Sequence, residues 1–344
     1  MLKLRRGIVV AADPLTVTVG GEERRAWADE TLVGACEVGD EVVVNTAALD
    51  LALGSGGFDV VHVNLSRGLG GGETPEGVHV MKLNYTSLQH AVDPIEAPAG
   101  APARPARRIP VLVLPLHGYL APAAWAFGEA AGGKLGYVQT AGAALPGSMS
   151  RDVAALRERG LLAESVSSGP CFGADREAIS VVGALHAAGL DLGWDAAVVG
   201  PGPGILGSAS RYGHGGMAAL DAAHGALALG LPVLVAPRMS SGEERERHLG
   251  LSHHTRSVLE LLLAGVRVPV PAGLEELWPA GAGKGAGTIA EACGEQHQAV
   301  PAPADLDGYA ASGLPRRTMG RDLEDDRLFF AAALASGRAL AEAG

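Results

Sequence analysis

The sequence predicts an α/β protein, with a doubly wound, mostly parallel sheet preceded by a small N-terminal β-barrel-like domain. Apolar strand-like runs alternate with helix-like stretches after residue 110, which is typical of a parallel sheet covered on both faces. Short strand-like runs joined by tight turns fill the first 96 residues. A Pro/Ala-rich segment separates these two regions.

The N-terminal region, 1–96, has no helix-like stretch between its predicted strands, and this favours a small barrel. An alternating LTVTV run leads into a Gly20–Gly21 turn, a plausible hairpin. The predicted strands of this region are 4–19, 24–28, 38–45 and 58–65.

The segment APAGAPARPARRIP, residues 97–110, is predicted to be a linker between domains. We therefore expect a doubly wound domain over 111–272 and, after it, a Gly/Pro-rich segment with a C-terminal helix over 273–344. The helices of the α/β region are bounded by Ser or Asp at their starts and Gly at their ends, as helix termini require. Strands are predicted at 111–116, 135–140, 161–167, 196–199, 233–236 and 266–270, and helices at 151–159, 175–188, 215–229, 253–264 and 322–342.

The composition limits the classes of protein to which the chain can belong. Of the 344 residues, 47% are hydrophobic and 19% charged, as in a globular protein. The net charge of −11 argues against a general nucleic-acid binder, and the absence of a run of about 18 apolar residues argues against a membrane protein. Three widely spaced cysteines form no disulfide framework, so we expect a cytoplasmic protein, with a homo-oligomer as one possible state.

In open parallel sheets, ligands bind beyond the carboxyl ends of the strands, near the point where the strand order reverses. Most loops that follow the predicted strands are rich in polar side chains, although loops are commonly polar for other reasons. The candidates in these loops are His117, Cys171, Ser208, Arg211, Tyr212, His214 and Arg238.

The loop GPGPGILGSASRYGHGG, residues 200–216, contains a G-x-G-x-x-G motif. A dinucleotide fingerprint also needs an acidic residue at the next strand end, and Arg238 stands there instead. Pro201 and Pro203 also lack the backbone N–H donors that a phosphate-binding turn would use. The sequence therefore identifies no cofactor. We expect Arg211, Tyr212 and the backbone of Gly213, Gly215 and Gly216 to bind an anion, with a structural turn as the alternative.

The candidate catalytic residues are His117 and His214 as acid/base groups and Cys171 as a nucleophile. Cys171 stands before a predicted helix, whose dipole would lower the thiol pKa, although a free cysteine is more often an inert buried group. No metal site is expected, because no H-E-x-x-H motif occurs and the adjacent His253 and His254 would point in different directions on a helix.

The segment MKLNYTSLQHAVDPIE stands just before the predicted linker and has polar residues within an apolar frame. Its position favours a contribution of Lys82 and Asn84 to an interdomain cleft. An exposed strand is the alternative.

Four long motifs carry a resemblance to a known family: KLNYTSLQHAVDP, HGYLAPAAWA, GPGPGILGSASRYGHGG and RMSSGEERERHLGLSHHT. Together they resemble an uncharacterised bacterial family known by a domain-of-unknown-function label, which implies no activity. Residues 199–232 are also similar, more locally, to the B component of glycine and sarcosine reductases. Gly200, Arg211, Tyr212 and Gly213 match that segment, whereas the paired redox residues have no counterpart. This similarity implies an α/β scaffold that holds small anionic molecules.

Two functions are compatible with these observations. The first is an enzyme that acts on a small anionic metabolite at the carboxyl ends of the sheet strands. The second is a non-catalytic small-molecule sensor or binding module.

Overall fold

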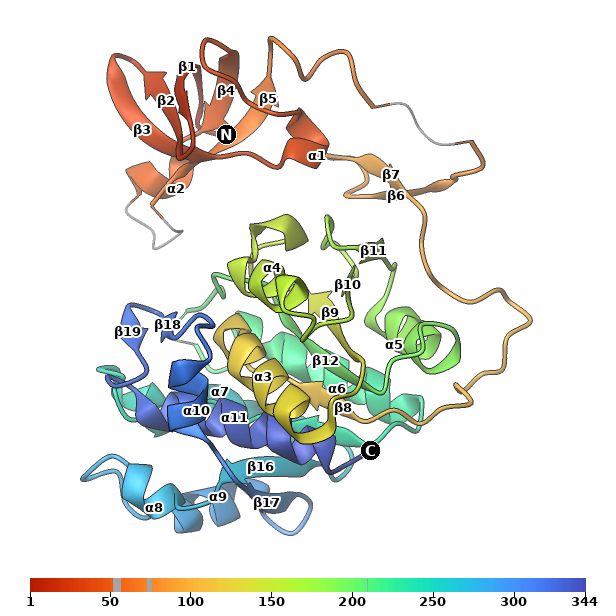
Figure 1. Ribbon diagram of the computed structural model, residues 1–344, viewed down its shortest axis with the longest axis vertical. Helices are drawn as coiled ribbons and strands as arrows, with labels where there is room; N and C mark the ends of the chain where they lie inside the picture. Colours follow the sequence, from red (N-terminus) through yellow and green to blue (C-terminus); the bar gives the residue numbers. More distant parts are fainter. Residues whose placement is uncertain (52–56, 73–75, 209) are drawn as a thin grey trace. The chain divides into compact units, whose positions relative to one another are not determined.

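The structure, a computed structural model, describes residues 1–51, 57–72, 76–208 and 210–344 (Figure 1). The chain folds into two compact units, Met1–Val92 and Asp93–Gly344. The segment predicted as a linker, 97–110, therefore belongs to the second unit. Its Arg107 side chain donates to Asp195, and its Pro102 carbonyl accepts from His186 at 2.7 Å.

The first unit contains a closed five-stranded barrel, which confirms the predicted barrel-like domain. The strand order is β1-β2-β3-β5-β4, in which only β3 and β5 pair in parallel. Two four-residue helices and a β6–β7 hairpin complete the unit. The elements are β1 Leu4–Ala12, β2 Leu15–Val19, β3 Glu22–Trp27, α1 Glu30–Val33, β4 Glu41–Asn45, α2 Ala47–Asp50, β5 Asp59–Asn64, β6 Val80–Lys82 and β7 His90–Val92.

A buried carboxylate supports the small valine-rich core of the barrel. Asp40 accepts hydrogen bonds from the Glu37 backbone N–H, from Asn64 and from Arg67, each at 2.9 Å. The backbone bond from Glu37 is the largest cause that lowers the pKa of Asp40, to about 2, and Asn64 and Arg67 lower it further. Because charged Asp40 satisfies three donors, it fixes the chain between α1 and β4 against the end of β5.

We expect the stability of the barrel to depend on pH through Asp40. Its pKa is lower in the folded state, so its contribution is present above the ordinary value of 3.8 and is lost as the pH falls toward about 2. Asp40→Asn should destabilise the barrel at neutral pH and remove this acid-dependent component. Hydrogen exchange of the β4 and β5 amides between pH 2 and 7 measures both effects. An equal acid dependence in Asp40→Asn would contradict the assignment, and exposed Glu22→Gln serves as the control.

The second unit is built on an eight-stranded parallel sheet in the order β11-β10-β9-β12-β8-β13-β16-β17, which confirms the predicted α/β fold. From β8 the chain first builds β9, β10 and β11 on one side, then inserts β12, and then builds β13, β16 and β17 on the other side. The strand order therefore reverses around β8 and β12. The strands are β8 Val111–Val113, β9 Leu135–Thr140, β10 Glu164–Ser167, β11 Arg176–Glu177, β12 Ala196–Pro201, β13 Val233–Val235, β16 Arg267–Pro271 and β17 Gln298–Ala302.

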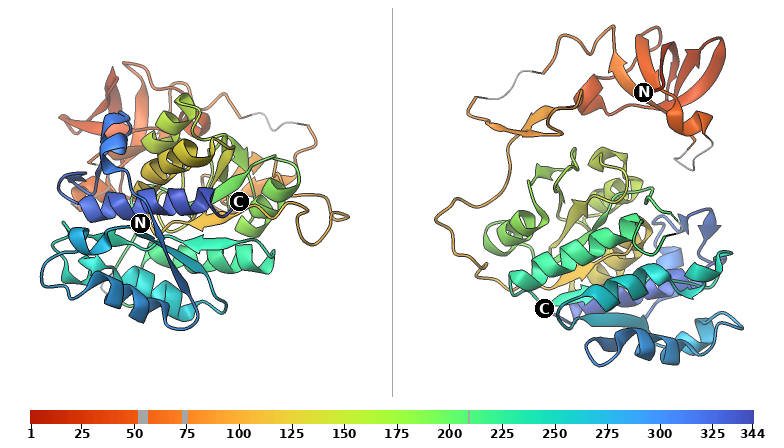
Figure 2. Two further views of the ribbon diagram at one scale, coloured as in Figure 1. Left: turned by 60° about the horizontal axis from the view of Figure 1, so that its bottom comes forward. Right: turned by 180° about the vertical axis from the view of Figure 1, so that it is seen from behind.

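Helices cover both faces of this sheet. In Figure 1, α3 and α11 lie in front of it, and α6 and α7 come to the front in the reverse view of Figure 2. Two short antiparallel ladders, β14–β15 and β18–β19, lie outside the main sheet. The helices are α3 Leu120–Ala131, α4 Arg151–Glu158, α5 Val181–Leu190, α6 Ala218–Ala228, α7 His253–Leu261, α8 Leu274–Leu277, α9 Gly285–Cys293, α10 Leu306–Ala311 and α11 Arg327–Ala341, and the short strands are β14 Met239–Ser240, β15 Gly250–Leu251, β18 Arg317–Thr318 and β19 Arg321–Asp322.

Several elements differ from the sequence-based expectations, among them the C-terminal helix, which was predicted from residue 322 and begins at Arg327. The helix predicted from Asp175 begins only at Val181, because Ser180 caps it while Asp175 accepts from the backbone N–H and hydroxyl of Ser165. The segment expected to be Gly/Pro-rich, 273–344, contributes β17, which includes Pro301. An edge strand pairs on one side only, so it tolerates a residue without an N–H donor.

Helix α11 is buried on almost every side, between α3 and the strands β8, β16 and β17. Gly337 allows this close packing, since a Cβ atom there would lie 2.0 Å from the Ala123 carbonyl oxygen of α3. The backbone of α3 leaves no room for a methyl group.

Gly337→Ala should therefore destabilise the second unit, despite the better helix propensity of alanine. We expect a loss of about 1–3 kcal/mol, the usual range for overpacking a core. Gly287→Ala is a matched control in α9, where a Cβ atom would meet only Lys284 Cβ, at 4.0 Å. It should gain about 0.5–1 kcal/mol. Urea unfolding compares both variants, and equal stability would contradict the close α3–α11 contact.

Candidate functional site

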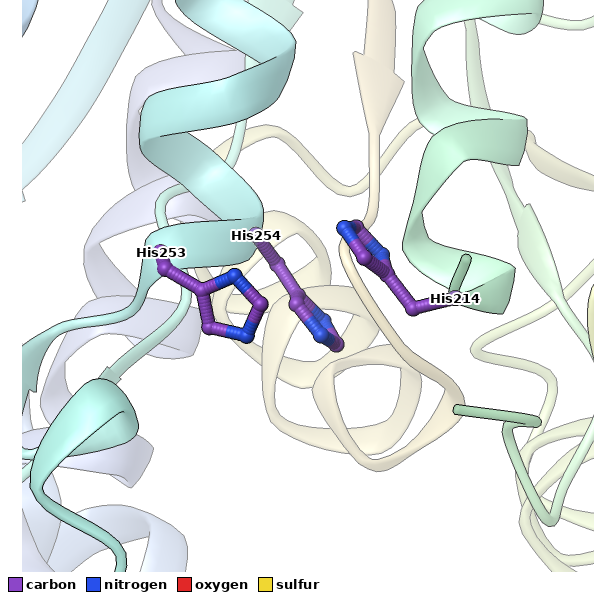
Figure 3. Close-up of side chains that lie close together, drawn as sticks. All are labelled: His214, His253 and His254. Carbon is purple, nitrogen blue, oxygen red and sulfur yellow. The ribbon is translucent and has the colours of Figure 1, made fainter. Parts of the chain in front are cut away.

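Four imidazoles gather where the loop after β12 meets the start of α7, and Figure 3 shows three of them, His214, His253 and His254. His214 and His254 stack face to face, with ring centroids 3.6 Å apart and planes inclined by 4°. The rings of His253 and His248 stand 4.5 and 4.8 Å from that of His254. We call His214, His248, His253 and His254 the histidine cluster.

Local hydrogen bonds set the positions of these rings. Ser252 is the N-cap of α7, and its hydroxyl oxygen accepts the His254 N–H at 3.2 Å. The same hydroxyl is hydrogen-bonded to Nδ1 of His248 at 2.7 Å. A serine at this helix start therefore places one histidine before α7 and two in its first turn.

Two nitrogens of the histidine cluster are buried and have no hydrogen-bond partner among the residues that the structure describes: Nδ1 of His214 and Nε2 of His253. The other nitrogen of His214 donates to the Arg211 carbonyl at 3.0 Å. A neutral imidazole has one donor and one acceptor nitrogen, so this bond leaves the Nδ1 lone pair of His214 available.

A buried guanidinium stands beside the cluster. Arg238 is 3% exposed, and its Nη1 lies 3.1 Å from Nδ1 of His254. Because a guanidinium can only donate, this nitrogen of His254 accepts. Burial is the largest cause that lowers the pKa of all four imidazoles, and the charge of Arg238 lowers it further, to about 2 for His254 and about 3 for His248. The cluster is therefore neutral at neutral pH.

His253 also lines a cleft of about 520 Å³ that runs along α7 toward the end of α9, which we call the α7 cleft. Two ion pairs stand on its walls, Arg211 with Glu260 and Arg256 with Glu291, the second at 3.5 Å. Its lining also includes Ser257, Leu259, Ala292, Cys293, Gly294, Glu295, Gln296 and His297.

The glycine-rich loop closes on itself. The N–H of Gly213 donates to Ser210, that of His214 to Tyr212, and that of Gly215 to Leu206. Ser208, a predicted binding residue, donates its hydroxyl to the Gly213 carbonyl. The backbone donors that the predicted anion site would use at Gly213 and Gly215 are thus engaged within the loop.

Close packing accounts for several of these glycines. A Cβ atom at Gly202 would lie 2.5 Å from the Ala144 carbonyl oxygen, and one at Gly215 would lie 1.9 Å from that of Gly142. At Gly216 it would stand 3.0 Å from Nδ1 of His214 and 3.1 Å from Nδ1 of His254. The motif therefore allows the loop to approach its neighbours and leaves space beside two imidazoles.

Arg211 and Tyr212 extend from this loop into solvent. Arg211 forms an exposed pair with Glu260 and lies over the Tyr212 ring, 5.3 Å from its centroid. The predicted anion-binding side chain is thus on the wall of the α7 cleft, with a glutamate as its present partner.

The other predicted catalytic histidine belongs to a different polar group. His117 is hydrogen-bonded through Nε2 to Ser150 at 2.7 Å, and its Nδ1 lies 3.3 Å from the Pro201 carbonyl. Asp152 is 3.8 Å from the same Nε2, so it does not orient the opposite nitrogen as a catalytic triad requires. Burial lowers the pKa of His117 and raises that of Asp152. Ser150 also caps α4, which gives this group a structural role.

The remaining predicted residues are not members of the histidine cluster. Cys171 is 0% exposed in the core of the second unit. Lys82 and Asn84 belong to the β6–β7 hairpin region of the first unit, where Lys82 is buried and Asn84 exposed. The histidine cluster and the α7 cleft are formed by residues of the second unit alone.

The sequence analysis named His253 and His254 but did not make them candidates, because neighbours on a helix point about 100° apart. These two residues occupy the first turn of α7, where the loop carrying His214 approaches the helix end. Three histidines within seven residues, in the segment that leads from the predicted strand 233–236 into the predicted helix 253–264, were the available signal.

The fold and the site define an α/β protein with a doubly wound sheet and a buried histidine cluster, joined to a small β-barrel. A family model matches residues 25–337, and the chain belongs to that family, described as Protein of unknown function (DUF3866). No curated protein and no solved structure matches the chain significantly, and the local similarity to the reductase B component is not shown. Within the described residues, every helix is too short or too polar to cross a membrane.

The burial of the cysteines predicts the order in which they react. Cys36 is the only one that is partly exposed, whereas Cys171 and Cys293 are buried. We expect an alkylating agent at pH 7 to label Cys36 first and Cys171 only when the second unit opens. Peptide mass spectrometry over time measures the three rates. Fast labelling of Cys171 in the folded protein would instead support the nucleophile hypothesis.

Proposed function

We propose that the second unit is an enzyme that acts on a small anionic metabolite bound in the α7 cleft, with the histidine cluster as its reactive centre. The observation that carries this proposal is the unpartnered Nε2 of His253, since this residue lines a cleft that also contains two arginines. A neutral imidazole offers an electron pair for chemistry on a bound molecule, which the ion pairs on the walls of the cleft do not offer.

Arg211 supports an anionic ligand. Its pair with Glu260 is exposed on both sides, and exposed ion pairs of this kind add little stability in water. A carboxylate or phosphate can replace Glu260 at little cost and gain two parallel hydrogen bonds from the guanidinium. Since the protein carries a net charge of −11, this attraction has to be local.

The position of the cleft also supports catalysis. Its His253 end is next to the loop after β12, and β12 is a strand at the reversal point of the sheet. Ligands in open α/β sheets bind at such points, because loops from both halves of the sheet meet there. His214 follows β12 and His253 follows β13, so the cluster combines the two loops.

A thermal-shift titration with phosphate, sulfate and small carboxylates tests binding. The wild type should show saturable stabilisation, about 2.7 kcal/mol when the ligand reaches 100 times its dissociation constant. Arg211→Ala should lose most of this response, and Glu260→Gln should strengthen it by removing the competing carboxylate. Arg338→Ala is the matched control, because Arg338 forms an exposed pair with Glu342 on α11. An unchanged response in Arg211→Ala would place the anion elsewhere.

Turnover is tested with the same protein. Mixtures of phosphorylated and carboxylated metabolites are incubated with the wild type and followed by mass spectrometry. His253→Gln should retain anion binding and convert the substrate about 10²–10⁴ times more slowly. Saturable binding without conversion of any component would favour the binding-module alternative.

A further inference from the structure

We propose that His214, His253 and His254 form a binding site for a divalent transition-metal ion, with Zn²⁺ as the expected ion. One ligand nitrogen from each residue lies within 4.8 Å of the other two. This inference deepens the proposed function, and it rests on that function only for the role of the ion in catalysis.

The unpartnered nitrogens are the first argument. His214 is 6% exposed, and its Nδ1 has no partner among the described residues, nor has the buried Nε2 of His253. A buried polar atom without a partner destabilises the fold, because it has lost its hydrogen bonds to water and gained none in the protein. Nδ1 of His214 follows β12 and Nε2 of His253 stands in the first turn of α7, so two distant segments bring two such nitrogens into one cluster. This arrangement indicates a ligand that accepts electron pairs. A metal ion is such a ligand.

The hydrogen bond on the far side of His214 is the second argument. Its Nε2–H donates to the Arg211 carbonyl at 3.0 Å, which fixes the tautomer and leaves Nδ1 free to coordinate. Ligating histidines commonly donate their other N–H to a carbonyl or carboxylate in this way. The same loop residue, Arg211, thereby presents its backbone to the ligand histidine and its side chain to the α7 cleft.

The chemistry of the donors selects the metal. The set contains three neutral imidazoles and no carboxylate, so it suits Zn²⁺, Co²⁺, Ni²⁺ or Cu²⁺ and not Mg²⁺ or Ca²⁺. A site with three protein ligands leaves one position for water or substrate. His253 lines the α7 cleft, so that position would face the proposed substrate.

His254 has to move to complete the site. An imidazole lone pair lies in the plane of its ring, so two rings stacked 3.6 Å apart do not direct lone pairs at one ion (Figure 3). In addition, Nδ1 of His254 accepts a hydrogen bond from Arg238. We infer that His254 turns out of the stack when the ion binds, and that the ion replaces Arg238 as its positive partner. Glu243, 3.8 Å from Arg238, remains to balance the released guanidinium.

The test is a titration of tag-free, chelator-treated protein with Co²⁺, followed by its visible absorption and by competition with Zn²⁺. The wild type should bind one equivalent with the intense bands of a four-coordinate site, and Zn²⁺ should displace Co²⁺ and raise the unfolding temperature. His214→Gln and His253→Gln should each weaken binding by about 100-fold or more. His224→Gln, on α6 and outside the cluster, is the control and should bind as the wild type does.

Circular dichroism establishes that each variant is folded, and His253, which is only partly buried, provides a test even if the variant at the buried His214 unfolds. Binding that is absent from the wild type, or unchanged in His253→Gln, would overturn the metal site. Arg211→Ala separates the two proposals, because it should lose the anion response and retain Co²⁺ binding. An Arg211→Ala variant that loses the anion response but still binds Co²⁺ supports the anion site in the α7 cleft. A His253→Gln variant that loses Co²⁺ binding supports the metal site.

Discussion

The carboxylate of Asp326 joins the buried helix α11 to the segment that carries Arg238, beside the histidine cluster. It is 0% exposed, caps α11, and accepts hydrogen bonds from the Ser240 hydroxyl at 2.6 Å and from Arg321 at 3.1 Å. Ser240 is two residues from Arg238, whose guanidinium holds His254. A charge that is buried this completely has to be fully hydrogen-bonded, so the helix, the β14 segment and the histidine cluster depend on one another.

The buried position of Arg238 also bears on the charge of the histidine cluster. Arg238 places a positive charge inside the protein next to four imidazoles, and a second positive charge on any of them would be repelled. Burial and, in addition, repulsion by Arg238 therefore keep the imidazoles as bases and electron-pair donors. The same arginine donates to Nδ1 of His254, one of the two nitrogens through which this ring could bind the proposed ion. Arg238 is thus both a support of the site and a competitor for it.

The sequence was sufficient to predict the architecture, because the physical signals of a parallel sheet are local. Apolar runs predicted β9 at its observed bounds, and Ser150 marked the start of α4. Helix α3 was not predicted, since Pro122 in an alanine-rich stretch resembles a loop, although proline is tolerated in a first helical turn. Strand β17 was missed for a similar reason, because two alanines and Pro301 leave Val300 as its one β-branched residue.

The candidate site was less accessible to sequence reasoning, because it depends on contacts between distant segments. His214 and Arg238 were singled out from their positions after strands, and the structure connects both to His254. Whether a nitrogen is left without a partner depends on how three segments pack, and no spacing in the sequence reports that. The engagement of the Gly213 and Gly215 N–H groups likewise follows from the closed form of the loop.

The burial of α11 against α3 also has a consequence for the synthesis of this protein. Helix α3 and the central strands leave the ribosome early, but the surface that they present remains uncovered until residues 327–341 have been made. The second unit therefore gains its stability late, after most of the chain has emerged, and until then it exposes apolar surface of the kind that chaperones bind. A ribosome that stalls between β17 and α11 would release a chain with a nearly complete sheet and an open apolar face, and such a chain would be prone to aggregate.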